Sequence, residues 1–283
     1  MSGGQEALRA AMAAGEGQGV APRDAKRLLA HAAKVDAARL MLLGAVDLTA
    51  DVMARYGQYL ARRAGGEPVS KITGKRAFWN HEFVVTPDVL DPRADTETLV
   101  AKALERDFTR ILDLGTGTGC ILLSLLAERA QASGMGVDIS PAALEVAREN
   151  AARTGVGARA DLRLSDWFDA VEGRFDLITA NPPYITEEEM ADLSPEVRDH
   201  DPYLALTPGG DGLAPYRILA AQAAGFLHPD GRIIVEMGWR QGPDVARIFR
   251  DHGWRGVEIF PDLEGRDRIV AACAPQDNAR ADP

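Results

Sequence analysis

The stretch Asp113-Leu114-Gly115-Thr116-Gly117-Thr118-Gly119 decides how this chain folds. It follows a short apolar run, 110–114, that is typical of a buried strand, and it precedes an apolar run at helical spacing, 121–130. A glycine-rich turn between a strand and a helix lets the backbone approach a ligand closely and aims helix N–H groups at it. The stretch therefore predicts a loop that binds a nucleotide-type cofactor.

Beyond this loop, apolar runs expected as strands alternate with stretches at helical spacing. The expected strands are 135–139, a run marked by Leu162 and Leu164, 175–180, 232–236, 257–260 and 268–272, and the expected helices are 141–152, 216–227 and 245–250. This alternation predicts a mainly parallel, doubly wound sheet. In such a sheet the first and fourth strands flank the point where the strand order reverses, and ligands bind there.

Acidic and aromatic residues follow the next two expected strands. Asp138 lies nineteen residues beyond Gly119, where an acid can accept hydrogen bonds from both ribose hydroxyls. Asp166 and Trp167 are placed to contact an adenine ring, although for Trp167 packing in the core is an alternative. The pattern fits S-adenosylmethionine better than a dinucleotide, because Cys120 stands where a dinucleotide loop has its last glycine.

Asn181-Pro182-Pro183-Tyr184 follows the fourth expected strand. An amide nitrogen is a weak nucleophile because its lone pair is delocalised. The Asn181 side-chain oxygen and the Pro182 carbonyl can accept its two N–H groups and aim the lone pair at a methyl carbon, while the prolines fix the backbone. Tyr184 can cover one face of a planar group. These residue types predict methyl transfer to an amide or amino nitrogen, whereas the alternative is that Asn-Pro only begins a turn.

The first part of the chain has a different character. Residues 5–65 are rich in alanine and leucine and predict a small helical bundle that recognises a partner; its apolar stripes are Leu28, Leu29, Ala32 and Val35, and Val52, Tyr56, Tyr59 and Leu60. Gly65-Gly66-Glu67-Pro68 breaks the helical pattern, and 77–79 with 82–85 predict a hairpin. We expect domains at 1–66, 67–92 and 93–275, with a polar tail at 276–283. Asp95 or Thr96 is expected to cap the helix that follows, unless it belongs to a functional block.

The net charge of −10 is uneven, since residues 1–65 carry +3 and the remainder carries −13. The negative charge of the remainder would repel the phosphates of a long nucleic-acid duplex. The positive charge of the helical module at 1–65 suits an acidic protein partner. No apolar run reaches the roughly 18–20 residues of a membrane span, and no signal peptide is evident, so the cytoplasm is expected. Cys120 and Cys273 are expected as small buried residues, and the scattered histidines predict no metal site.

Taken together, these residues resemble the release-factor glutamine methyltransferase family (HemK/PrmC). The similarity runs from about Glu67 to Ala272. Besides the loop and the turn, it includes Ile72-Thr73-Gly74, Phe83-x-Val85, Val89-Leu90-x-Pro92-Arg93-x-Asp95-Thr96-Glu97, Gly210-x-Gly212-Leu213, Glu236-x-Gly238-x-x-Gln241 and Asp267-Arg268. The resemblance implies a seven-stranded Rossmann-like class I methyltransferase domain, preceded by a helical bundle and a β-hairpin linker.

The family methylates the glutamine side chain in the Gly-Gly-Gln motif of class I peptide chain release factors, with S-adenosyl-L-homocysteine as the second product. The resemblance implies that the cofactor is bound by Asp113, Gly115, Thr116, Gly117, Thr118, Gly119, Asp138, Asp166, Trp167 and Asn181. It implies that Asn181, Pro182, Pro183 and Tyr184 receive the glutamine and that Asn181, Pro182 and Tyr184 are catalytic. No metal, membrane or direct nucleic-acid binding is implied.

The sequence departs from the family pattern at Lys71, Asp91, Ala94 and Asp201, which affects the expected partner contacts more than the chemistry. The block at 93–97 favours this family over the relative that modifies a large-subunit ribosomal protein.

Two further alternatives come from other classes. Adenine-amino methyltransferases of DNA or RNA share the four-residue turn and act on a flipped base, but they need a basic and aromatic recognition region. Here Glu187-Glu188-Glu189 follows the turn instead. A cofactor-binding protein without catalysis would require a damaged loop or turn, and both are intact.

Overall fold

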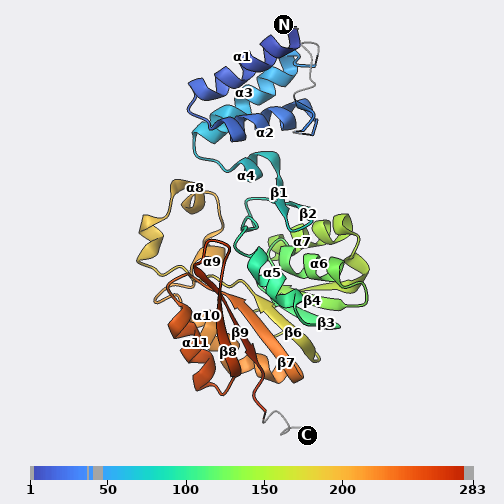
Figure 1. Cartoon of the computed structure of the whole chain (residues 1–283), viewed down its shortest axis with the longest axis vertical. Coiled ribbons are helices and arrows are strands. Elements are labelled where there is room, and N and C mark those ends of the chain that lie inside the picture. Colours follow the sequence, from blue (N-terminus) through green and yellow to red (C-terminus); the bar gives the residue numbers. More distant parts are fainter. Residues whose placement is uncertain (1–2, 37, 41–46, 277–283) are drawn as a thin grey trace. The chain divides into compact units, whose positions relative to one another are not determined.

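The computed structural model of the chain describes residues 3–36, 38–40 and 47–276 (Figure 1). The chain divides into two compact units. One consists of Met1–Lys75 and Ser194–His200, and the other of Arg76–Leu193 and Asp201–Pro283. Apart from its first residue, the expected polar tail at 276–283 lies outside the described residues.

The first unit is the predicted helical bundle. It contains α1 (Gly3–Gly17), α2 (Pro22–Ala33), α3 (Ala50–Ala64), α4 (Val69–Thr73) and α8 (Pro195–Arg198). Pro22 occupies the first turn of α2, and the Thr49 side chain caps α3. Leu28 and Tyr56 from the predicted stripes are buried, and the Tyr56 hydroxyl donates a hydrogen bond to the Ala11 carbonyl oxygen at 3.2 Å. Burial of these two stripes accounts for the bundle.

A hairpin of β1 (Lys75–Phe78) and β2 (His81–Val84) follows, as predicted. Its turn is made by Trp79, which has a left-handed φ of 51°, and Asn80. The side chains of both residues donate hydrogen bonds to Glu128 Oε1, at 2.7 and 2.8 Å. The Trp79 N–H donates to Glu97 Oε1 at 2.8 Å. The hairpin is therefore fixed to the helices of the second unit.

Among the described residues, the second unit contains a seven-stranded sheet in the order β5-β4-β3-β6-β7-β9-β8. Its strands are β3 (Arg110–Leu114), β4 (Ser133–Asp138), β5 (Ala160–Leu164), β6 (Phe175–Ala180), β7 (Leu227–Glu236), β8 (Arg255–Pro261) and β9 (Asp267–Cys273). The strands from β3 to β7 pair in parallel, and β9 is antiparallel to both β7 and β8. The predicted doubly wound sheet is confirmed, and β3 and β6 are neighbours where the strand order reverses.

Helices cover both faces of this sheet (Figure 1). They are α5 (Glu97–Leu104), α6 (Cys120–Glu128), α7 (Pro141–Thr154), α10 (Ala214–Gln222) and α11 (Gly242–Asp251). The connections also contain the short helix α9 (Tyr203–Leu206) and 3-10 turns at Gly157–Arg159, Glu189–Asp192 and Ala223–Phe226. Ile111 packs in the layer with α5 and α6, whereas Leu112 packs in the layer with α10 and α11. Alternate residues of each buried strand thus serve opposite layers.

Two expectations about individual segments were wrong. β7 begins at Leu227 rather than at 232, because Pro229-Asp230-Gly231 lies within the strand at an irregularity of its pairing with β6. Cys273 is only partly buried, on β9 beside the edge strand β8. Cys120 is buried as expected, and burial raises the pKa of its thiol to about 12, so it is a packing residue rather than a nucleophile.

Within the part of the chain that the structure describes, none of the helices has the length and apolar character needed to cross a membrane.

The contact between α6 and the sheet depends on a glycine in β4. A Cβ atom at Gly134 would lie 2.5 Å from Leu122 Cδ1 and 2.7 Å from Ile111 Cγ2. Both neighbours are fully buried, so neither has free space into which to move. The absence of a side chain at Gly134 lets α6 lie close to the strands that end at the glycine-rich loop.

We therefore expect Gly134→Ala to lower the free energy of unfolding by about 1–3 kcal/mol, the usual effect of adding a methyl group to a filled core. Urea unfolding followed by circular dichroism would measure the change. Gly225→Ala is the matched control, because no atom lies within 4 Å of a Cβ at Gly225. Equal stability of the two variants would contradict this account of the packing.

Candidate active site

The glycine-rich loop leaves the sheet at the carboxyl end of β3. Gly115, Gly117 and Gly119 all have left-handed backbones, with φ of 66°, 55° and 79°. A Cβ at Gly119 would lie 2.8 Å from Leu123 Cδ1, whereas at Gly115 and Gly117 no atom lies within 4 Å. The third glycine therefore allows the helix to pack, and the first two leave open space in which a ligand can approach the backbone.

Asp113 joins this loop to the neighbouring strand. Its side chain is buried, and its two carboxyl oxygens accept hydrogen bonds from Thr116 Oγ1 at 2.7 Å and from Thr179 Oγ1 at 2.8 Å. Burial raises the pKa of Asp113 to about 6, and the two hydroxyls oppose that rise. Asp113 thus holds the start of the loop against β6. Thr116 and Thr118 are buried with it.

Asp138 ends β4 on the other side of the loop. Its carboxylate accepts hydrogen bonds from the Gly117 N–H at 2.8 Å and from the Ser140 N–H at 2.9 Å, one at each oxygen. Burial raises the pKa of Asp138, and these backbone donors oppose the rise. The Ile139 N–H is a third backbone donor to this carboxylate, and since its two oxygens have four lone pairs in all, it can still accept from a ligand.

The segment that contains Asp166 and Trp167 begins beside Asp138, whose carbonyl oxygen accepts a hydrogen bond from the Ser165 N–H at 3.0 Å. Asp166 is exposed. Trp167 is partly buried against the core and has a left-handed φ of 47°, which is unusual for a large side chain. Packing and a cofactor contact are both compatible with this position of Trp167.

Asn150 is a residue that the sequence reasoning missed. It is fully buried in α7, where its Oδ1 accepts from the Val84 N–H at 2.7 Å. Its Nδ2 donates to the Val84 carbonyl at 3.1 Å and to the Thr118 carbonyl at 3.0 Å. One side chain therefore fixes the hairpin to the glycine-rich loop. Helical periodicity gives no sign of such a residue.

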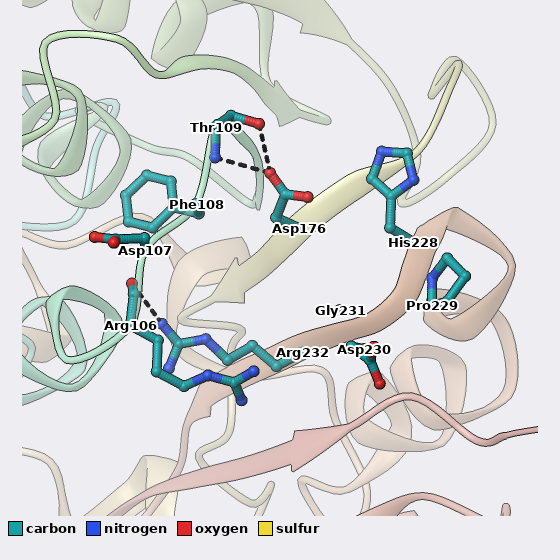
Figure 2. A pocket seen from close by; sticks show the side chains of 10 residues that line it. All are labelled: Arg106, Asp107, Phe108, Thr109, Asp176, His228, Pro229, Asp230, Gly231 and Arg232. Atoms are coloured by element: carbon teal, nitrogen blue, oxygen red, sulfur yellow. Dashed lines mark hydrogen bonds between the residues drawn. The ribbon is translucent and has the colours of Figure 1, made fainter.

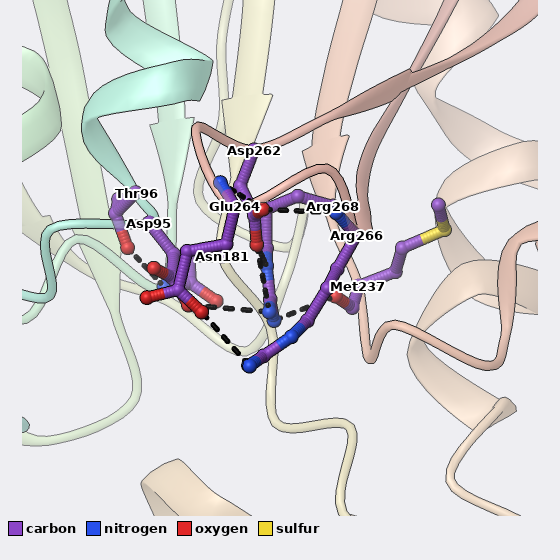
Figure 3. Close-up of polar contacts among 8 residues, drawn as sticks. All are labelled: Asp95, Thr96, Asn181, Met237, Asp262, Glu264, Arg266 and Arg268. Atoms are coloured by element: carbon purple, nitrogen blue, oxygen red, sulfur yellow. Dashed lines mark hydrogen bonds and ion pairs between the residues drawn. The ribbon is translucent and has the colours of Figure 1, made fainter.

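The turn Asn181-Pro182-Pro183-Tyr184 lies beside the loop, as predicted. β3 pairs with β6 so that Leu114 is opposite Ala180, and the loop and the turn leave the sheet at adjacent positions. Pro182 is buried, and the other three residues of the turn are partly buried. Asn181 Nδ2 donates a hydrogen bond to Thr96 Oγ1 at 3.3 Å (Figure 3).

Thr96 does not have the capping role that we expected. It precedes α5, but its backbone is already helical, with φ −65° and ψ −22°, and its side chain makes no capping hydrogen bond. Its buried hydroxyl is directed to Asn181 instead. Asp95, the other expected cap, forms an ion pair with Arg268 at 3.1 Å. Both residues belong to the site.

Glu236 is, like Asp113, an almost completely buried acid of this site. The register that pairs Ala180 with Val235 brings Asn181 and Glu236 to neighbouring strand ends. The Glu236 side chain is 1% exposed, and its Oε2 has no hydrogen-bond partner among the described residues. Burial raises the pKa of Glu236 to about 7, whereas hydrogen bonding by the Thr96 hydroxyl and the charge of Arg268 lower it.

Arg268, on β9, supplies the positive charge of this region. Its Nη2 lies 3.1 Å from Asp95 Oδ2 and 3.2 Å from Asp262 Oδ2, and its Nη1 donates to the Met237 carbonyl at 3.4 Å (Figure 3). These contacts hold a buried guanidinium group between three segments that meet at the carboxyl end of the sheet.

A second ion pair involves one of the departures from the family pattern. Asp201 is buried, and its Oδ2 accepts from Arg93 Nη2 at 2.6 Å. The resemblance implies a glutamate at this position, and the shorter aspartate still pairs with Arg93 of the 93–97 block.

The backbone of the turn is held by residues far away in sequence. The Tyr184 carbonyl accepts from Gln241 Nε2 at 2.9 Å, and Gln241 Oε1 accepts from the Gly238 N–H at 3.0 Å. A Cβ at Gly212 would overlap the Tyr184 carbonyl oxygen. Burial raises the pKa of the Tyr184 hydroxyl, so this residue stays neutral.

A long connection leads from the turn to α10, and backbone hydrogen bonds join its first residues to its last ones. The Ile185 N–H donates to the Leu206 carbonyl at 3.0 Å, and the Glu187 N–H donates to the Gly210 carbonyl at 3.1 Å. The start and the end of this connection therefore lie together.

A hollow of about 320 Å³ lies at the opposite, amino end of the strands (Figure 2). Two of its charged groups, Asp176 and Arg232, are engaged within the protein. Asp176 Oδ2 accepts from the Thr109 N–H and hydroxyl, both at 2.8 Å, and Arg232 Nη2 donates to the Ala103 carbonyl at 2.7 Å. Ligands of doubly wound sheets bind at the carboxyl ends of the strands, so we assign no function to this hollow.

The sequence offered a partial signal for the residues that were missed. Thr96, Glu236, Gln241 and Arg268 all belong to stretches that resemble family blocks, but no chemistry was attached to them. Their roles become visible only when α5, β7 and β9 are brought together in the fold.

Comparison with known proteins matches both parts of the chain. The PrmC N-terminal domain family matches residues 6–74, and the methyltransferase small domain family matches residues 75–199. A release factor glutamine methyltransferase of Cereibacter sphaeroides is 53% identical over 95% of this chain and 98% of its own length. One of Agrobacterium fabrum is 45% identical, over 87% of this chain and 88% of its own length.

Among solved structures, a methyltransferase from Pyrococcus furiosus superimposes with a TM-score of 0.55 at 16% identity. The match covers 77% of this chain and 98% of that chain. At this level of identity the likeness concerns the fold alone.

The raised pKa of Glu236 predicts how stability depends on pH. Between about pH 4 and 7 the folded protein retains a proton that the unfolded chain has lost, so the free energy of unfolding falls as the pH rises through this window. Glu236→Gln removes that loss. We expect its Tm to match that of the wild type at pH 5 and to exceed it at pH 8 by about 5–10 °C, which corresponds to ~2–3 kcal/mol.

Differential scanning calorimetry at the two pH values would measure this effect. Asp113 contributes a change of the same sign, but it is common to both proteins and cancels in the comparison. A Tm difference that does not change between pH 5 and 8 would show that Glu236 does not titrate in this range.

Proposed function

The chain belongs to the release-factor glutamine methyltransferase family and is a methyltransferase, and on this premise we propose that it methylates the glutamine of the Gly-Gly-Gln motif in class I peptide chain release factors. The methyl group would come from S-adenosyl-L-methionine and would go to the side-chain amide nitrogen. The main support is the pairing of β3 with β6, which sets the Asn181 turn beside the glycine-rich loop. This reaction belongs to the cytoplasm, where translation ends.

The loop has features that fit this cofactor. The open space at Gly115 and Gly117 suits a ligand that lies against the backbone. The remaining acceptor capacity of Asp138, at the end of the strand that follows the loop, suits a ribose hydroxyl. When bound, the cofactor would supply an electrophilic methyl group on a sulfonium ion. We propose that Gly115 to Gly119 and Asp138 bind it, with Asp166 or Trp167 beside the adenine.

The Asn181 turn has features that fit an amide nitrogen. The Asn181 Nδ2 is engaged by Thr96, so its Oδ1 is directed away from Thr96 and can accept an N–H of the acceptor amide. The Pro182 carbonyl would accept the other N–H, and Tyr184 would cover a face of the amide. These contacts orient the nitrogen lone pair and favour its pyramidalisation, which is catalysis by positioning.

The helical unit is the proposed recognition module for the partner. The PrmC N-terminal domain family covers 6–74, close to the recognition domain that we propose at 1–66. Its net charge of +3 suits an acidic surface.

Asn181→Ala tests the proposal most directly. The protein would be incubated with S-adenosyl-L-methionine and a purified class I release factor, and the added methyl would be located by mass spectrometry. We expect one methyl on the Gly-Gly-Gln glutamine with the wild type, and a rate at least about 100-fold lower with Asn181→Ala, since one preorganised hydrogen-bonding group contributes about that much.

Asn80→Ala, in the hairpin turn, is the matched control and is expected to keep wild-type activity. No transfer to the release factor by the wild type would overturn the proposed substrate. Transfer to adenine in a nucleic acid would instead favour the alternative function considered from the sequence.

A further inference from the structure

A hydroxyl group has one hydrogen to donate, and this fixes the direction of the hydrogen bonds around Thr96. The Thr96 hydroxyl hydrogen-bonds to the Glu236 carboxyl group and also lies 3.3 Å from Asn181 Nδ2. An ionised carboxylate can only accept, so Thr96 must donate its hydrogen to Glu236. Its oxygen is then left to accept from Asn181, which the Asn181 amide can satisfy only with its NH2 group.

The orientation of the Asn181 amide matters for the proposed reaction. The acceptor amide presents N–H groups, which need an oxygen. If Thr96 were free to donate to Asn181, the Asn181 oxygen would be drawn toward Thr96, and its NH2 group would face the acceptor. The Asn181 NH2 group would then face the N–H groups of the amide to be methylated. Two hydrogen-bond donors cannot bind each other, so the nitrogen of that amide would not be held.

We propose that Glu236 and Thr96 are positioning residues that hold the Asn181 amide with its oxygen facing the acceptor nitrogen. This inference rests on the proposed function of the Asn181 turn. It explains why Thr96 does not cap α5 and why a carboxyl group is buried at the end of β7 where an apolar residue would cost less.

The charged and titratable groups around Glu236 allow it to change its protonation near neutral pH. They come from every element packed against it: Arg268 on β9, Arg93 and Asp95 before α5, Tyr184 after β6, Tyr216 on α10 and Cys120 on α6. Arg93 and Arg268 favour the ionised form, and burial and Asp95 oppose it, so the pKa is about 7. Below that pH a protonated Glu236 can donate to Thr96, and the orientation of Asn181 is no longer enforced.

Thr96 provides the first test, because a matched pair of variants is possible. Thr96→Val removes the hydroxyl and keeps the shape, whereas Thr96→Ser keeps the hydroxyl. We expect kcat for release-factor methylation to fall about tenfold or more in Thr96→Val, as for loss of one hydrogen bond to a charged group. KM for S-adenosyl-L-methionine should not change. Thr96→Ser should retain most of the activity, and equal kcat in the two variants would overturn the proposal.

The pH profile provides the second test. We expect kcat/KM of the wild type to fall with unit slope below about pH 7, as one group becomes protonated in the free enzyme. This limb should disappear in Glu236→Gln and persist in Glu145→Gln, a control at an exposed position on α7. A limb that persists in Glu236→Gln would overturn the role of Glu236.

A third measurement does not depend on activity. The side-chain NH2 signal of Asn181, assigned in an NMR spectrum by its loss in Asn181→Ala, should shift with pH around 7 in the wild-type protein and not in Glu236→Gln. If this shift is seen but no methyl reaches the release factor, the proposed function fails and the positioning holds. If methyl transfer occurs and the Asn181 signal does not titrate, the positioning fails and the function holds.

Discussion

The pairing of β3 with β6 is the constraint on which the rest of the site depends. The register sets Leu114 opposite Ala180, and the buried hydrogen bond between Asp113 and Thr179 reinforces it. A shift of one residue would turn every side chain of one strand to the other face of the sheet. The glycine-rich loop and the Asn181 turn would then no longer leave the sheet together. Two segments more than sixty residues apart form one site because of this pairing.

Several charged side chains are buried close to the ends of these strands. Arg268 is held by Asp95 and Asp262, and Glu236 lies among these groups with one oxygen that has no hydrogen-bond partner in the described part of the chain. Burying an unpaired carboxyl oxygen costs stability, and such a cost is typical of functional sites. The same residue is thus expected to lower stability and to promote catalysis. This opposition distinguishes it from Asn150, whose buried amide is fully hydrogen-bonded.

The sequence predicted a mainly parallel, doubly wound sheet, the adjacency of its first and fourth strands and the two motifs, because periodicity and glycine content are local signals. It did not predict Thr96 correctly, since a threonine before a helix usually caps it and only the tertiary contact with Asn181 overrides that preference. Asn150 and Glu236 were missed as working residues for the same reason, because their partners lie on other elements. The start of β7 was misplaced because a proline and a glycine normally end a strand, and here an irregularity accommodates them.

The connection between the turn and α10 is held together at its two ends, and this affects how far its length and sequence can change. Its ends are held together by the Ile185–Leu206 and Glu187–Gly210 hydrogen bonds and by the close contact of Gly212 with Tyr184. Closing a longer loop between fixed ends costs little additional entropy. Apart from Asp201, which pairs with Arg93, the residues between these two pairs of hydrogen bonds are therefore expected to tolerate changes of length and sequence without moving the Asn181 turn.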